Sequence, residues 1–152
     1  MRISCKTSAT ILPLIFVGIA SQSVPSHAQH ASPNLYGQLG LNTVPSARMD
    51  KTGTLRAGVS TLDPYTHAWM GLQLATPLYI TLRQSAENFG INEDPDRLYP
   101  GLDLKARLLK EDESRPEISI GLQSAAGHKR MAGEYIAASK RYKNFDFTAG
   151  LG

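Results

Sequence analysis

The sequence predicts an all-β protein built as a meander of antiparallel strands. Apolar and polar residues alternate with a period of two along most of residues 54–152, a pattern typical of half-buried strands. The chain is punctuated by 13 Gly and 9 Pro residues, many of them in turn-forming dipeptides between the alternating runs. No helix capping box leads into an apolar stripe of helical period.

Residues 1–28 are predicted to be a secretory signal peptide. Arg2 and Lys6 precede an apolar run at 11–20, and Ser26-His27-Ala28 fits a small-x-small cleavage site. The run is too short to span a bilayer, which takes roughly 20 residues. Cys5, the single cysteine, precedes the apolar run, so it is not placed to accept a lipoprotein lipid. We therefore expect an exported chain without disulfides.

Removal of the signal peptide nearly neutralises the chain. It leaves 14 basic against 13 acidic side chains. The remaining basic residues form no continuous stripe, so the sequence does not predict nucleic-acid binding.

Residues 29–53 are rich in Gly, Pro, Asn and Ser and show no periodicity. We expect an extended segment with turns there, followed by the strand meander over residues 54–152. The seven predicted strands cover residues 54–62, 66–74, 78–85, 101–109, 117–124, 131–142 and 144–152.

Each predicted strand has an apolar row and ends at a turn signal. Asp63-Pro64 and Thr76-Pro77 end the first two strands, and a polar connection at 86–100 follows the third. Charged or small residues at 110–116 and 125–130 flank the fifth strand. The clearest apolar rows are Leu55, Ala57 and Val59; Ala68, Met70, Leu72 and Leu74; Leu78, Ile80 and Leu82; Leu102, Leu104, Ala106 and Leu108; Ile118, Ile120 and Leu122; and Phe145, Phe147, Ala149 and Leu151.

The polar rows favour part of an outer-membrane β-barrel that these strands leave incomplete. Charges near strand centres would be costly in a packed core but would stay hydrated in a water-filled lumen. Strand lengths also suit a tilted bilayer crossing of about 9–11 residues. The predicted lumen-facing residues are Arg83, Asp103, Lys105, Arg107 and Gln123. The alternative is a soluble periplasmic β-rich domain that binds glycan, since that class has the same alternation.

Aromatic residues near the predicted strand ends suggest an interfacial girdle. The candidates are Tyr65, Trp69, Tyr79, Tyr99, Tyr135 and Tyr142.

No catalytic, cofactor or metal motif is evident. His30, His67 and His128 lack ligand spacing, and we expect them to be solvated. Glu93, Asp94 and Asp96 form an acidic loop without an EF-hand pattern. A glycan-processing enzyme using Asp103 and Glu117 is the weakest hypothesis. We therefore expect neither an enzyme nor a cofactor.

Three blocks of sequence resemble a known family. They are "GLNTVPSARMDKTGTLRAGVS" at 40–60, "DRLYPGLDLKARLLKED" at 96–112 and "GEYIAASKRYKNFDFTAGLG" at 133–152. Together they look like the YjbH-like exopolysaccharide biosynthesis proteins, and the last block matches most closely.

The resemblance implies an outer-membrane β-barrel protein of Gram-negative bacteria that takes part in exopolysaccharide biosynthesis or export. The implied partners are outer-membrane lipid, the exopolysaccharide and other components of its export system. Members of this family are several times longer, and seven strands are too few to close a bacterial barrel of eight or more. We therefore expect this chain to be an N-terminal part of a barrel.

Overall fold

The computed structural model describes residues 31–87 and 98–152. The predicted signal peptide, His30 and the acidic loop with Glu93, Asp94 and Asp96 lie outside the described residues.

The protein is built on one antiparallel sheet whose strands follow one another in sequence order. This confirms the predicted all-β meander. The seven strands are β3 (Leu55–Leu62), β4 (Tyr65–Ala75), β5 (Leu78–Glu87), β6 (Leu98–Leu109), β7 (Glu117–Gly127), β8 (Gly133–Tyr142) and β9 (Phe145–Leu151). No α-helix occurs in the described ranges, and a short 3-10 turn, η2 (Lys129–Met131), joins β7 to β8.

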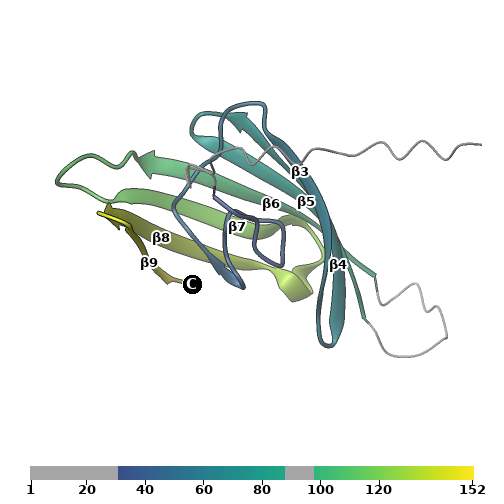
Figure 1. Ribbon diagram of the computed structural model, residues 1–152. Coiled ribbons are helices and arrows are strands. Elements are labelled where there is room, and N and C mark those ends of the chain that lie inside the picture. The colour runs from purple at the N-terminus through teal and green to yellow at the C-terminus, as the bar shows by residue number, and fades with distance from the viewer. Residues whose placement is uncertain (1–30, 88–97) are drawn as a thin grey trace, which may run out of the picture.

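The sheet curves into an open half-barrel, with β3 and β9 at its two edges (Figure 1). Its outer face carries the predicted apolar rows, which remain largely exposed. Leu55, Val59, Met70, Leu82, Leu108, Ile120, Ile136, Phe147 and Leu151 are between 42% and 78% exposed. The inner, concave face carries the polar rows.

Strands β6 and β7 extend furthest beyond the ranges that the sequence pattern indicates. β6 begins at Leu98 because Leu98 pairs with Ala86 of β5, so the predicted 86–100 connection is partly strand. β7 continues to Gly127 through an irregularity of its register with β6, where Leu102 pairs with Ala126 and Leu104 with Leu122. Turn residues can extend a strand when a bulge absorbs the extra length.

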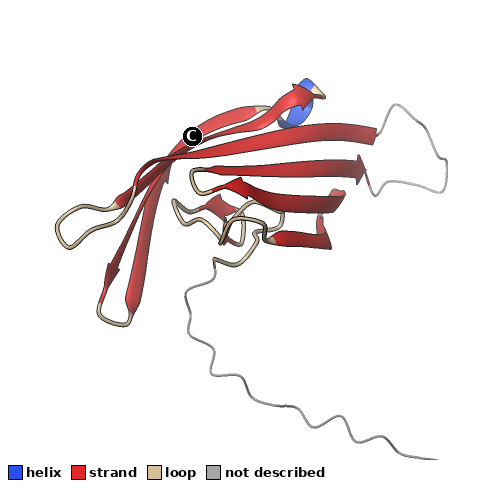
Figure 2. Ribbon diagram, turned by 90° about the horizontal axis from the view of Figure 1, so that it is seen from above, coloured by secondary structure: helices blue, strands red, loops and turns tan. Residues whose placement is uncertain are grey.

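Residues 32–50, which we call the inner segment, lie inside the curve of the half-barrel (Figure 2). The segment folds on itself through a small antiparallel pair, β1 (Gly40–Leu41) with β2 (Val44–Pro45). Its Leu39 and Ala47 are fully buried against the concave face. The predicted extended segment is therefore a folded layer that covers the polar side of the sheet.

Candidate functional site

The centre of the concave face holds a buried ion pair from two neighbouring strands. Arg83 of β5 and Asp103 of β6 are 2% and 1% exposed, and Arg83 Nη2 lies 3.2 Å from Asp103 Oδ1. The same guanidinium donates to Ser124 Oγ, while the Ser124 N–H donates to Asp103 Oδ1 at 2.7 Å. Asp103 thus caps the irregular stretch of β7, where Ser124 has a φ of 47°.

Lys105, two residues further along β6, fastens the inner segment to the sheet. Its Nζ donates to the carbonyl oxygen of Leu39 at 3.3 Å and to that of Arg48 at 2.6 Å. A buried ammonium needs such acceptors because it has left its hydration shell. One lysine therefore binds the segment at two places, in its middle and near its C-terminal end.

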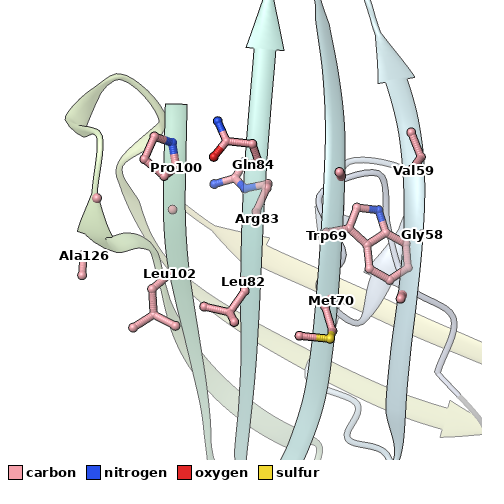
Figure 3. Close-up of a pocket in the computed structure, with 14 residues that line it drawn as sticks. Gly58, Val59, Trp69, Met70, Leu82, Arg83, Gln84, Pro100, Leu102 and Ala126 are labelled. Atoms are coloured by element: carbon pink, nitrogen blue, oxygen red, sulfur yellow. The ribbon is translucent and has the colours of Figure 1, made fainter. Parts of the chain in front are cut away.

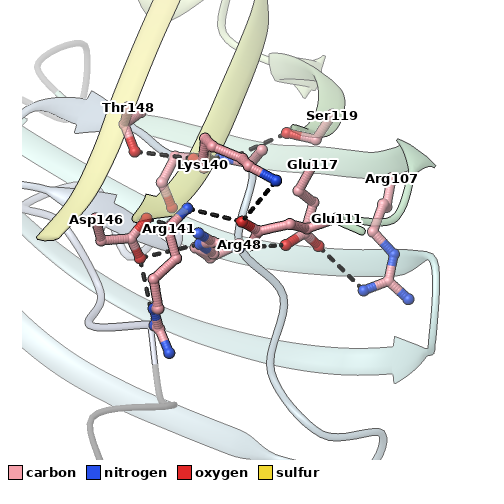
Figure 4. A network of polar contacts seen from close by, with 12 residues as sticks. Arg48, Arg107, Glu111, Glu117, Ser119, Lys140, Arg141, Asp146 and Thr148 are labelled. Atoms are coloured by element: carbon pink, nitrogen blue, oxygen red, sulfur yellow. Dashed lines mark hydrogen bonds and ion pairs between the residues drawn. The ribbon is translucent and has the colours of Figure 1, made fainter. Parts of the chain in front are cut away.

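Arg107 and Glu117 begin a charged cluster at one end of the half-barrel (Figure 4). Arg107 of β6 pairs with Glu117 of β7 at 3.1 Å. Arg48 of the inner segment also donates to Glu117, at 3.0 Å, and binds Asp146 of β9 through both Nε and Nη2. A third carboxylate, that of Glu111 in the β6–β7 loop, pairs with Arg48 Nη1.

The cluster shifts the ionisation of the groups outside the strands. Burial alone would raise the pKa of Glu111, but the Arg141 N–H and the Arg48 guanidinium outweigh it and lower the pKa. Burial likewise opposes the charge of Arg48, yet its hydrogen bonds to Asp146 and Glu111 raise the pKa of the guanidinium. Charge-assisted bonds of this kind are the stronger ones in proteins.

Gln123 is the predicted inner residue that lies apart from this array. It lines a small hollow between β7, β8 and the turn between β1 and β2, together with Tyr135, Thr43 and Gly133. The structure therefore brings Arg83, Asp103, Lys105 and Arg107 together on β5 and β6. We expected hydrated side chains, whereas Arg83, Asp103 and Lys105 are buried beneath the inner segment.

Hydroxyl groups of the sheet bind the main chain of the inner segment. Tyr79 Oη donates to the Gly37 carbonyl at 3.1 Å, and Thr81 Oγ1 donates to the same oxygen at 3.4 Å. The Ala47 N–H donates to Ser139 Oγ at 2.9 Å, and Ser60 Oγ donates to the Leu35 carbonyl. The period-two pattern gives no indication of these partners.

Several aromatic residues occupy the concave face instead of an interfacial girdle. Tyr79 and Tyr99 are buried, at 1% and 5% exposure. Trp69 lies beneath the inner segment, so close to Gly37 that a Cβ there would meet the indole ring at 2.6 Å. The girdle expectation is wrong for these residues, because their ring faces pack against the covering segment and the neighbouring strands.

His67 is also buried, at 1% exposure, so the expectation of a solvated side chain is wrong for it. Its Nδ1 lies 2.8 Å from Ser85 Oγ, and its ring makes an edge contact with Tyr36 of the inner segment. The Arg83 guanidinium in turn lies over the Tyr36 ring, with Arg83 Cζ 5.3 Å from the ring centre. His128 is exposed, as expected, and caps the 3-10 turn by accepting from the Arg130 N–H.

Several buried polar atoms beneath the inner segment have no hydrogen-bond partner within the described part of the chain. On the sheet these are His67 Nε2, Trp69 Nε1, Arg83 Nε, Asp103 Oδ2 and Tyr135 Oη, and on the segment Asn34 Nδ2 and both amide atoms of Gln38. Buried polar atoms are nearly always satisfied in native proteins. This array therefore has capacity for a polar ligand or water.

The outer face has a shallow apolar hollow across β3 to β7 (Figure 3). Cross-strand registers place Met70, Leu82 and Leu102 in one row, with Ala57 and Ala126 at its ends.

Metal ligands and membrane helices are not found within residues 31–87 and 98–152. That part of the chain contains no group of three or more His, Cys, Asp or Glu side chains placed to hold a metal ion. It also contains no helix long and apolar enough to cross a membrane.

These features define a class of protein: a curved antiparallel half-barrel with an apolar outer face and a polar inner face covered by its own N-terminal segment. Residues 32–152 match the family described as "Exopolysaccharide biosynthesis protein YbjH". The chain belongs to this YjbH exopolysaccharide biosynthesis family.

One relative is the "Uncharacterized lipoprotein YjbH" of Escherichia coli strain K12. It is 34% identical over 127 residues, a match that covers 77% of this chain and 18% of the relative. The chain thus corresponds to less than a fifth of that protein's length. No solved structure matches the chain.

Proposed function

We propose that this chain forms part of the wall of an outer-membrane β-barrel that takes part in exopolysaccharide biosynthesis or export. The observation that carries the proposal is the division of the sheet into an exposed apolar outer face and a polar inner face. The strands of outer-membrane barrels alternate in the same way, with apolar side chains facing lipid and polar side chains facing the lumen.

Family membership supports the proposed role in exopolysaccharide biosynthesis, and the fold supports the proposed location in the outer membrane. Exposed apolar side chains run across the whole outer face, from Val59 on β3 to Leu151 on β9. Soluble proteins rarely expose contiguous apolar patches larger than a few hundred Å². Outer-membrane lipid is therefore the proposed partner of this face.

We propose a non-enzymatic role in this process, with the exopolysaccharide and other components of its export system as partners. Asp103 and Glu117, the hypothetical catalytic pair, are each engaged by an arginine. Arg83 binds Asp103, and Arg48 and Arg107 bind Glu117. These contacts support a structural role for both carboxylates.

The test is deletion of the full-length gene in its host, followed by complementation and envelope fractionation. We expect the deletion strain to secrete less exopolysaccharide and the complementing protein to sediment with the outer membrane. Recovery of the protein in the soluble periplasm would support the glycan-binding domain instead. Unchanged secretion in the deletion strain would overturn the proposed process.

A further inference from the structure

The sheet binds residues 35–47 of the inner segment mainly through their peptide groups. In this stretch, the hydrogen bonds described above run from Ser60, Tyr79, Thr81 and Lys105 to carbonyl oxygens, and from a peptide N–H to Ser139. Donors of this kind recognise oxygen atoms rather than particular side chains. They can bind other oxygen-rich chains in the same positions.

The array of unpartnered polar atoms lies on neighbouring positions of this surface. Trp69 pairs directly with Arg83 across β4 and β5, and His67 pairs with Ser85 two residues away. On the other edge of β5, Thr81 pairs with Asp103 of β6. The unused atoms combine donors, such as Trp69 Nε1 and Arg83 Nε, with an acceptor, Asp103 Oδ2. Such a mixture matches hydroxyl groups, each of which both donates and accepts.

The segment buries little apolar surface of its own. Leu39 and Ala47 are the fully buried apolar side chains among its described residues. Regions with few buried apolar contacts open at a smaller free-energy cost than the core of a protein. When the segment leaves, Lys105 loses both of its carbonyl acceptors and the Trp69 ring loses its cover.

We propose that the concave strip formed by Trp69, Tyr79, Arg83, Asp103 and Lys105 binds a polyhydroxylated glycan chain. In the closed state described here, the main chain of the inner segment occupies the strip in place of the glycan. The choice of a glycan as the ligand rests on the proposed export function. The inference adds the surface that binds the glycan and the requirement that the inner segment be displaced first.

The experiment locks the segment in place. In a Cys5→Ser background, Ala47→Cys and Ser139→Cys are combined, because the Ala47 N–H already contacts Ser139 Oγ. The purified protein in detergent is titrated with a neutral dextran oligosaccharide and with an alginate oligosaccharide. Binding is followed by tryptophan fluorescence, and a Trp69→Phe variant identifies the Trp69 contribution. The two single-cysteine variants are the matched controls.

We expect the reduced protein to bind at least one probe and the disulfide-locked protein to lose about tenfold or more in affinity. Gly37→Ala should have the opposite effect and tighten binding. Gly37 has a φ of 80° and touches the Trp69 ring, so a methyl group there weakens the closed state without altering the strip.

Equal binding by locked and reduced protein would overturn the inference, as would failure of the reduced protein to bind either probe. Both results are separable from failure of the proposed function, which is judged from secretion by the deletion strain. Reduced secretion on gene deletion, without oligosaccharide binding, would leave the proposed function standing and remove the binding strip.

Discussion

The two carboxylate oxygens of Asp103 have different surroundings. Oδ1 accepts from Arg83 and from the Ser124 N–H, whereas Oδ2 has no partner in the described ranges. One side chain therefore fixes a neighbouring cation, shapes the irregular stretch of β7 and keeps an acceptor free beneath the inner segment. The surrounding side chains and the inner segment keep this pair out of bulk water.

At the residue scale, we predict that Asp103→Leu destabilises the protein strongly. The substitution leaves the Arg83 guanidinium buried without its carboxylate, at a cost of about 3–5 kcal/mol. The double variant Arg83→Met with Asp103→Leu should recover most of the loss, because no unpaired charge remains. Urea unfolding in detergent measures the free energy, with Gln84→Leu on the outer face as control. Equal stability of the single and double variants would contradict the buried pair.

At the scale of elements, the inner segment behaves as a layer held at its far end by charge. Arg48 joins the segment to carboxylates of the β6–β7 loop, β7 and β9. The contact with Glu111 depends on the carboxylate being ionised, and the pKa of Glu111 is lowered in the folded protein. A lowered pKa contributes stability above the ordinary value, near 4.3, and this stability is lost as pH falls through the folded value.

We therefore predict that the segment loosens only in acid. In the Cys5→Ser background, we compare the rates at which Ala47→Cys and Val59→Cys react with 4,4′-dithiodipyridine. The ratio of the Ala47→Cys rate to the Val59→Cys rate should stay constant between about pH 5 and 8 and rise below about pH 4. Glu111→Gln should react faster at neutral pH and show a smaller acid increase. Val59→Cys, on the exposed outer face, corrects for the intrinsic reactivity of the thiol. A rate ratio that does not rise in acid would contradict this role of Glu111.

At the scale of the whole molecule, the half-barrel turns its apolar rows outward and closes its polar rows with its own chain. This arrangement reverses the usual placement of a soluble sheet, which turns the apolar face inward against a core. This exposed apolar face is the physical basis of the membrane proposal.

We predict that Leu82→Arg destabilises the protein in lipid bilayers by about 2–4 kcal/mol, the cost of an arginine near the midplane on the lipid face of a barrel. Leu41→Arg, an exposed leucine of the inner segment, should change stability by less than about 0.5 kcal/mol. Urea unfolding from vesicles compares the two variants. A neutral Leu82→Arg in a protein that stays monomeric without detergent would support the soluble alternative.

The candidate site was only partly predictable from sequence. Alternation placed Arg83, Asp103, Lys105 and Arg107 on the inner face, because the side-chain direction of a strand is set locally by its pleat. Arg48 and Tyr36 were missed because they lie in an aperiodic stretch whose residues carry no pattern. The roles of Trp69 and His67 were missed because a covering layer decides their burial.

The sequence by itself determined the number and order of the strands in the main sheet and the character of its two faces. Both are encoded by local alternation and turn residues, and neighbouring strands pair through short connections. Only the tertiary structure decided what the inner face binds. Lys105 meets a carbonyl 66 residues away and Arg48 a carboxylate 98 residues away. Curvature of the sheet brings these groups together, and no local pattern records such contacts.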